Sequence, residues 1–365
     1  MKRKTLALVL AVFIAAPSAG AAAAAKFTLP EPTGRYPIGT TELHLVDHNR
    51  IDPWGAGRHR EVMVSLWYPA WPSARPVASH MHPAVADFYH SQLPADFTST
   101  RTHAPIDAVA LPGKRPVVLY SPGGGHSRAL GTTLVEDLAS RGFVVVAVDH
   151  TYAGPVQLPD RFEPPGRGVD RVLMMKERVR DVSFVLDQLA AHPNLDLSRV
   201  GMFGHSMGGF TAAEAMITER RIDAGINLDG SMDPGYGQAA TRGADRPFLL
   251  MGGGTSGDEN KPHTHQDAPD WASFWANSTG WKRDIHLPEA EHMSFADIQV
   301  ILPQINQQSP LPPELMATIG TVDPQRSLAA QQAYVAAFFD LHLRGRATEL
   351  FDRDSPAHPD ARLVP

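Results

Sequence analysis

The sequence contains no cysteine among its 365 residues. Disulfide bonds and cysteine-ligated metal sites are therefore excluded, and the hydrophobic core has to hold the fold. The sequence also lacks any concentration of charge of one sign. It has 33 Lys and Arg against 39 Asp and Glu, a formal net charge of −6, without a dense basic cluster or an acidic tail. This mixed pattern argues against a nucleic-acid partner.

Long hydrophobic runs are absent as well. The apolar run Thr5–Ala16 is shorter than the ~20 residues that a membrane-spanning helix needs. It follows the basic segment Met1–Lys4 and precedes a region of small residues, in which Ala19-Gly-Ala21 matches a cleavage site. This pattern is typical of a secretory signal peptide, and a retained membrane anchor is the less favoured alternative.

Residues 1–25 are therefore expected to be a signal peptide, and residues 26–365 a single domain. A chain with 43% hydrophobic and 20% charged residues is ordinary for a globular enzyme. We expect an exported protein, periplasmic or secreted, without an integral membrane segment in the mature chain. The sequence gives no indication of an oligomeric state.

From residue 116 onward, strand-like and helix-like runs alternate. The expected strands are Pro116–Tyr120, Phe143–Val148, Arg199–Phe203, Asp223–Leu228, Arg246–Met251 and Arg283–Leu287, preceded by two near Glu42–Val46 and Glu61–Tyr68. The expected helices are Leu130–Arg141, Arg171–Ala191, Met207–Thr218 and Gln325–Arg344. Such alternation predicts an α/β fold with a mainly parallel, twisted sheet and helices on both faces.

Three segments interrupt this pattern. Trp71–Ala110, rich in Pro, Ser and His, is expected to be a long connection with one short helix. Tyr152–Gly168 and Ile298–Val322 are expected to be inserted, lid-like loops over a substrate cleft. The reason is that loops longer than about 12–15 residues are usually functional or disordered.

A serine flanked by glycines stands where an expected strand meets an expected helix. The motif Gly204-His-Ser-Met-Gly-Gly209 follows the strand Arg199–Phe203 and opens the helix Met207–Thr218. A serine exposed at such a tight turn needs glycine neighbours, because side chains there would collide with the strand and the helix. The motif is weak by itself, but in this context it predicts Ser206 as a catalytic nucleophile of an α/β hydrolase.

A glycine loop, Ser121-Pro-Gly-Gly-Gly-His126, follows the first strand of the alternating region. Acyl transfer needs two backbone N–H donors at the developing oxyanion. One is expected from Met207, directly after the nucleophile, and the other from this loop. Gly124 is favoured over Gly123 and Gly125, although spacing does not decide the register. A phosphate-binding loop is disfavoured because the Gly-Lys-Ser/Thr ending is missing.

A serine nucleophile needs a histidine base and a carboxylate that orients it. In α/β hydrolases the chain order is Ser, then Asp or Glu, then His. His292, soon after the last expected strand, is the expected base, whereas His286 within that strand is expected to pack or face solvent. Asp229 at the end of the strand Asp223–Leu228 is favoured as the acid over Asp258, because strand ends hold side chains more accurately than loops.

The chain has 17 histidines, so most must serve other purposes. His80 with His82, and His263 with His265, form His-x-His pairs in polar stretches without a nearby third ligand. We expect solvated loop histidines there rather than a metal site. Neither a metal nor an organic cofactor is expected.

Aromatic and aliphatic side chains cluster in sequence around the expected base. They are candidates to line an apolar substrate cleft: Trp271, Phe274, Trp275, Phe295 and Ile298–Ile301. Core packing explains such residues equally well. The substrate-binding assignment of Trp271, Trp275 and Phe295 is therefore an expectation for the structure to test.

Several blocks resemble the plasma-type (isoform II) platelet-activating factor acetylhydrolase family and its bacterial exported relatives over most of the mature chain. They are Leu29-Pro-Glu-Pro-Thr-Gly34, Tyr36-Pro-Ile-Gly-Thr-Thr41, Tyr120-Ser-Pro-Gly-Gly-Gly125, Gly204-His-Ser-Met-Gly-Gly209, Gly225-Ile-Asn-Leu-Asp229, His292-Met-Ser-Phe-Ala-Asp297 and Ala337-Phe-Phe-Asp-Leu-His-Leu-Arg-Gly345. The glycine-serine turn is common to the whole superfamily, whereas the blocks ending at Asp229 and Asp297 are more specific. The family loop often reads His-Gly-x-Gly, and here Pro122 replaces that histidine.

The resemblance implies the triad Ser206, Asp229 and His292, with oxyanion donors from Gly124 and Met207. It also implies a serine esterase acting on small-molecule or lipid esters with short acyl chains. The acetyl group of platelet-activating-factor-like phospholipids is included among these.

Other functions share this triad. A broader carboxylesterase, a lipase or a polyester hydrolase would differ only in the cleft, and acyl transfer to an alcohol would share the acyl-enzyme. A non-catalytic lipid-binding relative would be expected to have lost a triad member. Because all three residues are present, that alternative is disfavoured.

Overall fold

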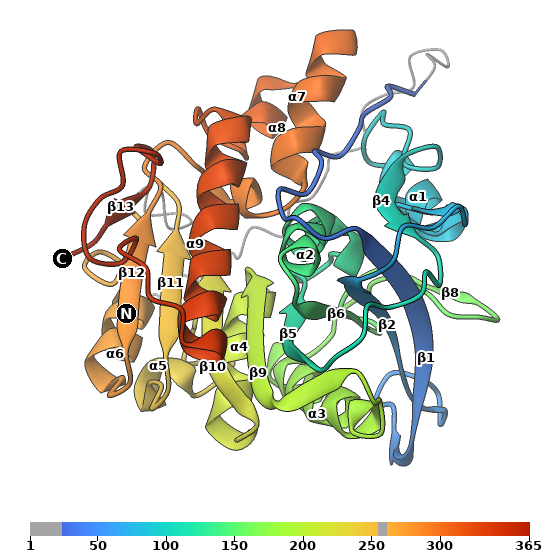
Figure 1. Ribbon diagram of the computed structural model, residues 1–365, viewed down its shortest axis with the longest axis horizontal. Coiled ribbons are helices and arrows are strands. Elements are labelled where there is room, and N and C mark those ends of the chain that lie inside the picture. The colour runs from blue at the N-terminus through green and yellow to red at the C-terminus, as the bar shows by residue number, and fades with distance from the viewer. Residues whose placement is uncertain (1–23, 255–260) are drawn as a thin grey trace.

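The computed structural model describes residues 24–254 and 261–365. In this part of the chain the centre is a nine-stranded sheet in the order β1-β2-β6-β5-β9-β10-β11-β12-β13 (Figure 1). The strands are β1 (Ile38–Ile51), β2 (His59–Pro69), β5 (Arg115–Ser121), β6 (Val144–His150), β9 (Leu195–His205), β10 (Ile222–Leu228), β11 (Phe248–Gly252), β12 (Lys282–His286) and β13 (Arg362–Leu363). The six strands from β6 to β12 run parallel, whereas β1, β2 and β13 pair antiparallel at the edges.

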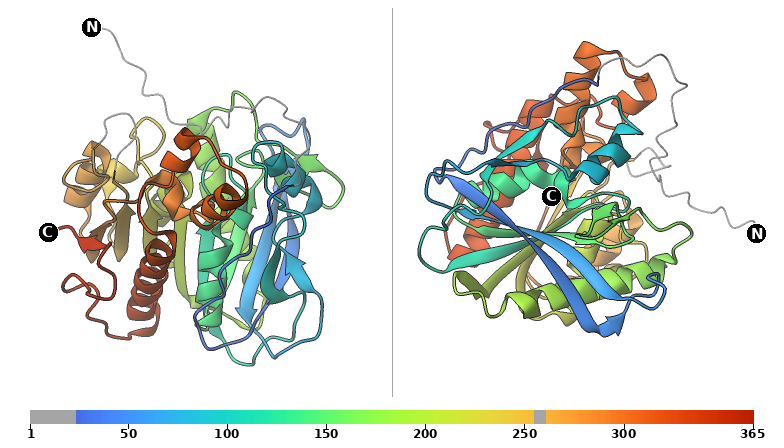
Figure 2. Two further views of the ribbon diagram at one scale, coloured as in Figure 1. Left: turned by 90° about the horizontal axis from the view of Figure 1, so that it is seen from above. Right: turned by 90° about the vertical axis from the view of Figure 1, so that its right-hand side faces the viewer.

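Helices cover both faces of the sheet (Figure 2). The helices α2 (Thr132–Ser140) and α9 (Pro324–Arg344) contribute to one hydrophobic cluster, and α3 (Arg171–Leu189), α4 (Met207–Thr218) and α6 (Pro269–Asn277) to another. Alternate residues of β5 divide between these clusters, with Val118 on the first side and Val117 on the second. Every residue of β6 is buried, as expected for a strand covered on both faces. The predicted α/β-hydrolase architecture is confirmed.

Local signals set the ends of the helices. The side chain of Asp323 accepts a hydrogen bond from the backbone N–H of Arg326 at the start of α9, and Pro324 occupies the first turn. The same helix ends at Gly345, whose φ of 65° lies in the left-handed region. The expected strands and helices of the alternating region are present, with ends shifted by a few residues.

The expected connection Trp71–Ala110 carries more structure than one helix. It contains β3 (Val77–Ser79), α1 (Pro83–His90) and β4 (Arg101–Pro105), and β3 pairs antiparallel with β4. The expected loop Tyr152–Gly168 likewise contains a hairpin of β7 (Val156–Gln157) and β8 (Phe162–Glu163). Strands of two to five residues are too short to show a recognisable alternation of apolar and polar residues in the sequence.

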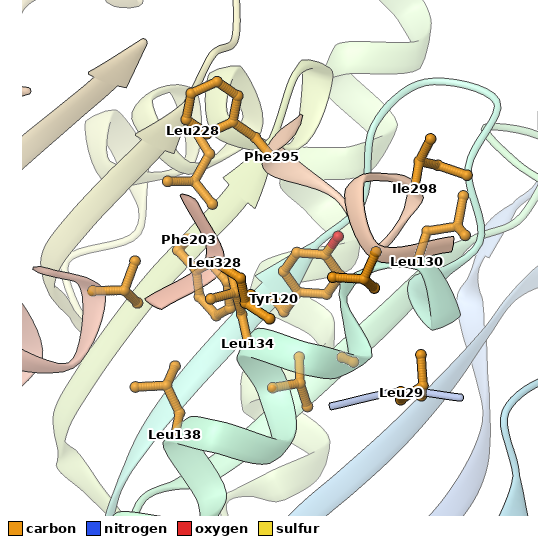
Figure 3. Packing of buried hydrophobic residues seen from close by; sticks show 14 of the residues in the cluster. Leu29, Tyr120, Leu130, Leu134, Leu138, Phe203, Leu228, Phe295, Ile298 and Leu328 are labelled. Carbon is orange, nitrogen blue, oxygen red and sulfur yellow. The ribbon is translucent and has the colours of Figure 1, made fainter. Parts of the chain in front are cut away.

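The expectation of a lid-like loop at Ile298–Val322 is wrong. This segment forms α7 (Ile298–Gln308) and α8 (Pro313–Ala317). The residues Ile298, Ile301 and Leu302 are each at most 1% exposed, because apolar side chains at this spacing form one helical face. Ile298 lies in the same packed cluster as Leu130 (Figure 3). Most of α7 is therefore part of the core, even though it contains Pro303.

The chain is already packed at Ala25. Its backbone N–H donates to the carbonyl of Pro94, and its carbonyl accepts from Asp96, at distances of 2.9 and 2.8 Å. Phe27 and Leu29 belong to the core cluster. The expected cleavage motif lies outside the described residues, while the expected domain boundary after residue 25 falls just inside the packed chain. No helix in the described ranges is long and apolar enough to cross a membrane.

Candidate active site

Ser206 occupies a strained turn between β9 and α4. Its φ of 55° and ψ of −124° are unfavourable for a side chain with a Cβ atom, and its N–H donates to the carbonyl of Leu228 at 2.9 Å. A Cβ atom on Gly208 would lie 1.8 Å from the carbonyl oxygen of Ser121. The turn can therefore form only because α4 starts against the end of β5 without a side chain between them. This geometry places Ser206 at the carboxyl end of the parallel sheet.

His292 begins the short 3-10 helix η3 (His292–Phe295), which follows β12. Its Nε2 lies 3.0 Å from Oγ of Ser206, and its side chain is 43% exposed. The backbone around it is held firmly, because Glu291 and Ser294 form a capping box at the start of η3. In addition, Nε2 of His205 lies 2.9 Å from the carbonyl oxygen of His292. The imidazole is thus held within reach of the serine and of solvent.

Asp229 follows β10 directly and is 3% exposed. Its Oδ2 lies 2.6 Å from Nδ1 of His292. The φ of Asp229 is 53°, so its backbone is strained as well. The side chain of Asn227 stabilises the turn that follows: it accepts a hydrogen bond from the N–H of Gly230 and donates one to the carbonyl of Gly230. Burial alone would raise the pKa of Asp229, but the nearby imidazoles of His263 and His292 outweigh burial and hold it well below its ordinary value. The carboxylate is therefore ionised at neutral pH.

The structure thus brings together three side chains that the sequence places far apart, Ser206, His292 and Asp229. The rival acid, Asp258, lies outside the described residues. Such an arrangement can deprotonate a serine hydroxyl and stabilise the imidazolium that results.

A second histidine, which the sequence did not predict, contacts Asp229. Nδ1 of His263 lies 2.9 Å from Oδ1 of Asp229, and His263 is 5% exposed. The expectation of a solvated loop histidine is wrong here, because the residue is buried and contacts Asp229 and the indole of Trp271. One sequence feature pointed to this contact: His263 lies in the segment between Asp229 and His292, which connects the acid to the base.

The other paired histidines are also engaged. Nδ1 of His265 lies 2.8 Å from a carboxylate oxygen of Asp284, and Nε2 of the buried His80 lies 2.8 Å from the carbonyl of Ala129. The solvated reading was wrong for these two as well. His82, more exposed, pairs with a glutamate at 2.7 Å. Within the described residues no group of three or more His, Cys, Asp or Glu side chains is arranged to hold a metal.

The glycine loop lies against the nucleophile. A Cβ atom on Gly123 would lie 3.4 Å from Cβ of Ser206, and one on Gly124 would lie 3.4 Å from the Met207 side chain. The N–H of Gly125 already donates to a carbonyl at 2.6 Å, so it is not available to a substrate. The N–H groups of Gly123 and Gly124 are the remaining candidates within the loop, together with that of Met207 at the start of α4.

A buried polar network supports this loop from below. Arg178 of α3 is fully buried and donates to Oγ of Ser121 and to the carbonyl of Pro122. Oγ of Ser121 also lies 3.0 Å from Nε2 of His150, whose Nδ1 is 2.9 Å from Oδ2 of Asp181. Burial lowers the pKa of Arg178 to about 9 and that of His150 to about 4. Since buried polar groups need partners, the network fixes the residues that precede the glycines.

The expected aromatic lining is wrong for two of its three residues. Trp271 is fully buried and Phe295 is 1% exposed, so both belong to the core rather than to a substrate surface. Figure 3 shows Phe295 within its core cluster. Nε1 of Trp271 donates to the carbonyl of Gly230 at 2.9 Å and so helps to hold the turn after Asp229. Trp275 is half-buried and stacks on a histidine, His265, with ring centroids 3.9 Å apart.

A cavity of about 430 Å³ lies elsewhere, between the β1–β2 edge and α1. Glu42, His80 and Arg128 are among its lining residues, and Ser206, Asp229 and His292 are not. The guanidinium of Arg128 is already engaged by Glu42 and Asp149. This cavity is therefore separate from the candidate triad at the strand ends.

Comparison with known proteins agrees with this geometry. The profile of the platelet-activating factor acetylhydrolase, isoform II family matches residues 21–154, and that of the serine aminopeptidase, S33 family matches residues 112–232. A probable 1-alkyl-2-acetylglycerophosphocholine esterase of Arthroderma benhamiae is 25% identical over 92% of this chain and 93% of its own length. A platelet-activating factor acetylhydrolase of Cavia porcellus is 24% identical over 57% of this chain and 56% of its own.

A solved structure, a ferulic acid esterase from Streptomyces cinnamoneus, is 40% identical, with a TM-score of 0.82. The similarity covers 93% of this chain and 99% of that chain. The chain therefore belongs to the α/β-hydrolase superfamily and is a carboxylic ester hydrolase, and residues 21–154 resemble the platelet-activating factor acetylhydrolase, isoform II family.

Proposed function

We propose that the chain hydrolyses short-chain acyl esters through an acyl-enzyme formed on Ser206. The observation that carries the proposal is the continuous chain of contacts from Oγ of Ser206 to His292 at 3.0 Å and from His292 to Asp229 at 2.6 Å. In this proposal His292 is the general base, Asp229 orients it, and the N–H groups of Gly124 and Met207 bind the oxyanion.

The reaction proceeds in two halves. Oγ of Ser206 attacks the ester carbonyl while Nε2 of His292 takes its proton, and the same proton then passes to the departing alcohol as the C–O bond breaks. A water molecule next attacks the acyl carbonyl and gives a proton to His292, which returns it to Oγ as the carboxylic acid leaves. Each oxyanion donor contributes about 3 kcal/mol to transition-state stabilisation.

Two acyl groups are supported by different relatives. Full-length similarity to a 1-alkyl-2-acetylglycerophosphocholine esterase favours an acetyl ester of a glycerophospholipid. The higher identity to a ferulic acid esterase favours an aromatic cinnamate-type acyl group as the second candidate. The half-exposed imidazole of His292 suits either, because the reacting ester can approach from solvent.

The test compares purified wild type with Ser206→Ala on p-nitrophenyl acetate, butyrate and palmitate, on methyl ferulate and on an acetylated phospholipid. Ser99→Ala, at an exposed serine in a loop, is the matched control. We expect turnover of short esters by the wild type and the control, and a loss of at least about a thousandfold in Ser206→Ala. A folded wild-type protein that cleaves none of these esters would overturn the proposal.

Covalent labelling by an organophosphonate provides an independent measurement of the nucleophile. It should modify one serine, and peptide mapping should identify that serine as Ser206. Adding methanol as an acceptor distinguishes hydrolysis from acyl transfer, because a transferase would yield mostly methyl ester.

We also propose that the chain is exported, on the strength of the basic, apolar and small-residue order of its first 25 residues. N-terminal sequencing of the protein recovered from the medium or periplasm tests this. An unprocessed N-terminus in the cell lysate would contradict it.

A further inference from the structure

The carboxylate of Asp229 is shared by two imidazoles. Oδ2 lies 2.6 Å from Nδ1 of His292, while Oδ1 lies 2.9 Å from Nδ1 of His263 and 2.9 Å from the backbone nitrogen of Gly253. A single histidine and a few backbone donors would suffice to orient an aspartate. The second imidazole therefore needs its own explanation.

His263 is held in place as firmly as the base itself. Its backbone N–H donates to the carbonyl of Gly253 at 3.2 Å, and its carbonyl oxygen lies so close to Gly252 that a Cβ there would be 1.9 Å away. Its ring packs on the indole of Trp271 with centroids 4.0 Å apart. An imidazolium is stabilised by such an aromatic face and by an ionised carboxylate.

Among the described residues, acidic side chains from three elements influence His263. Asp229 faces it from the end of β10, Asp270 from α6 and Asp284 from β12, and His292 lies on the far side of the shared carboxylate. Burial lowers the pKa of His263, but Asp229 above all outweighs burial, so the pKa is raised from the ordinary 6.5. The imidazole is therefore protonated to a larger extent than an ordinary histidine at the same pH.

We propose that His263 is a positioning residue for the base, because its imidazole holds Oδ1 of Asp229. When His263 is charged, it also screens part of the negative charge of Asp229 from His292. The inference rests on the proposed roles of Ser206, Asp229 and His292. A carboxylate that already pairs with one cation stabilises the protonated form of a second partner less strongly. The shared pairing therefore favours the neutral imidazole of His292, which can accept the proton of Ser206, over the charged form.

Two substitutions separate the charge from the hydrogen bond. His263→Gln keeps an N–H donor for Oδ1 but cannot be charged, so the acid limb of the pH profile of kcat/KM should move up by about 0.5–1 pH unit. His263→Phe keeps a ring against Trp271 but removes the donor, and kcat should fall about tenfold or more while KM stays within about twofold. His265→Gln is the matched control, because His265 stands two residues away and contacts Asp284 instead.

The control should retain the wild-type profile. Counting active sites with a covalent serine label corrects the rates for any misfolded fraction. An acid limb in His263→Gln that coincides with that of the wild type would overturn the inference.

Nuclear magnetic resonance of the wild type tests the pairing without substitution and without a substrate. With ¹⁵N-labelled histidine, two Nδ1–H protons should appear far downfield of the amide region, one on each side of Asp229, and His263 should titrate above an ordinary histidine. A neutral His263 across pH 6 to 8 would overturn the inference. If no ester is hydrolysed, the proposed function fails, whereas this measurement still decides whether the carboxylate is shared.

Discussion

The buried His150 should make the folded protein sensitive to mild acid. Burial lowers its pKa to about 4, whereas a histidine in the unfolded chain titrates at ~6.5. Because the folded pKa lies below the unfolded one, the unfolded chain binds the proton first. The stabilising effect of the neutral imidazole is complete above pH 6.5 and is lost as the pH falls toward 4. Between pH 8 and pH 5 this single group should cost about 2 kcal/mol of the free energy of unfolding.

Urea unfolding of the wild type and of His150→Asn at pH 8 and pH 5 measures that loss. Asparagine keeps a donor for Asp181 but does not titrate, so the variant should lose about 2 kcal/mol less than the wild type between the two pH values. His192→Asn, at an exposed position, should follow the wild type. The comparison uses the change with pH, so any constant effect of the substitution cancels. Equal losses in wild type and His150→Asn would refute the reasoning.

Two further substitutions test the strained turns of the site. Asp229→Asn should lower kcat by about 10⁴-fold without changing the fold, because an amide would favour the wrong tautomer of His292. Stopped-flow ester hydrolysis measures kcat and circular dichroism checks the fold. Activity within tenfold of the wild type would contradict the proposed role of Asp229. Gly208→Ala should lower the melting temperature and abolish activity, because the new Cβ would lie 1.8 Å from a carbonyl oxygen. Gly345→Ala, whose Cβ would meet no atom within 4 Å, should cost only about 1 kcal/mol, and equal melting of the two variants would count against the steric argument.

The sequence by itself determined the architecture and the three side chains of the candidate triad. Unalternating β-branched runs such as Phe143–Val148 indicate strands buried on both faces, and that is a local property of the chain. The glycine motif around Ser206 is also visible in the sequence, although one contact that requires it is not local, because Gly208 lies against Ser121 of β5. The expectation of a loop at Ile298–Val322 is wrong although the apolar residues of its first half have helical spacing. The proline-rich second half of the segment favours a loop, and this local composition outweighs the helical pattern before it.

Only the tertiary structure decided which buried groups touch the site. His263 and Arg178 stand 34 and 57 positions from the residues they contact, Asp229 and Ser121, and no spacing rule connects them. Trp271 and Phe295 are typical of both a cleft and a core, and their burial depends on what packs over them. Periodicity reports which face of an element is apolar, but not which other element covers it. The pairing of Asp229 with two histidines follows from the order of strands in the sheet, because parallel strands bring their carboxyl ends, and the loops that follow them, to one edge.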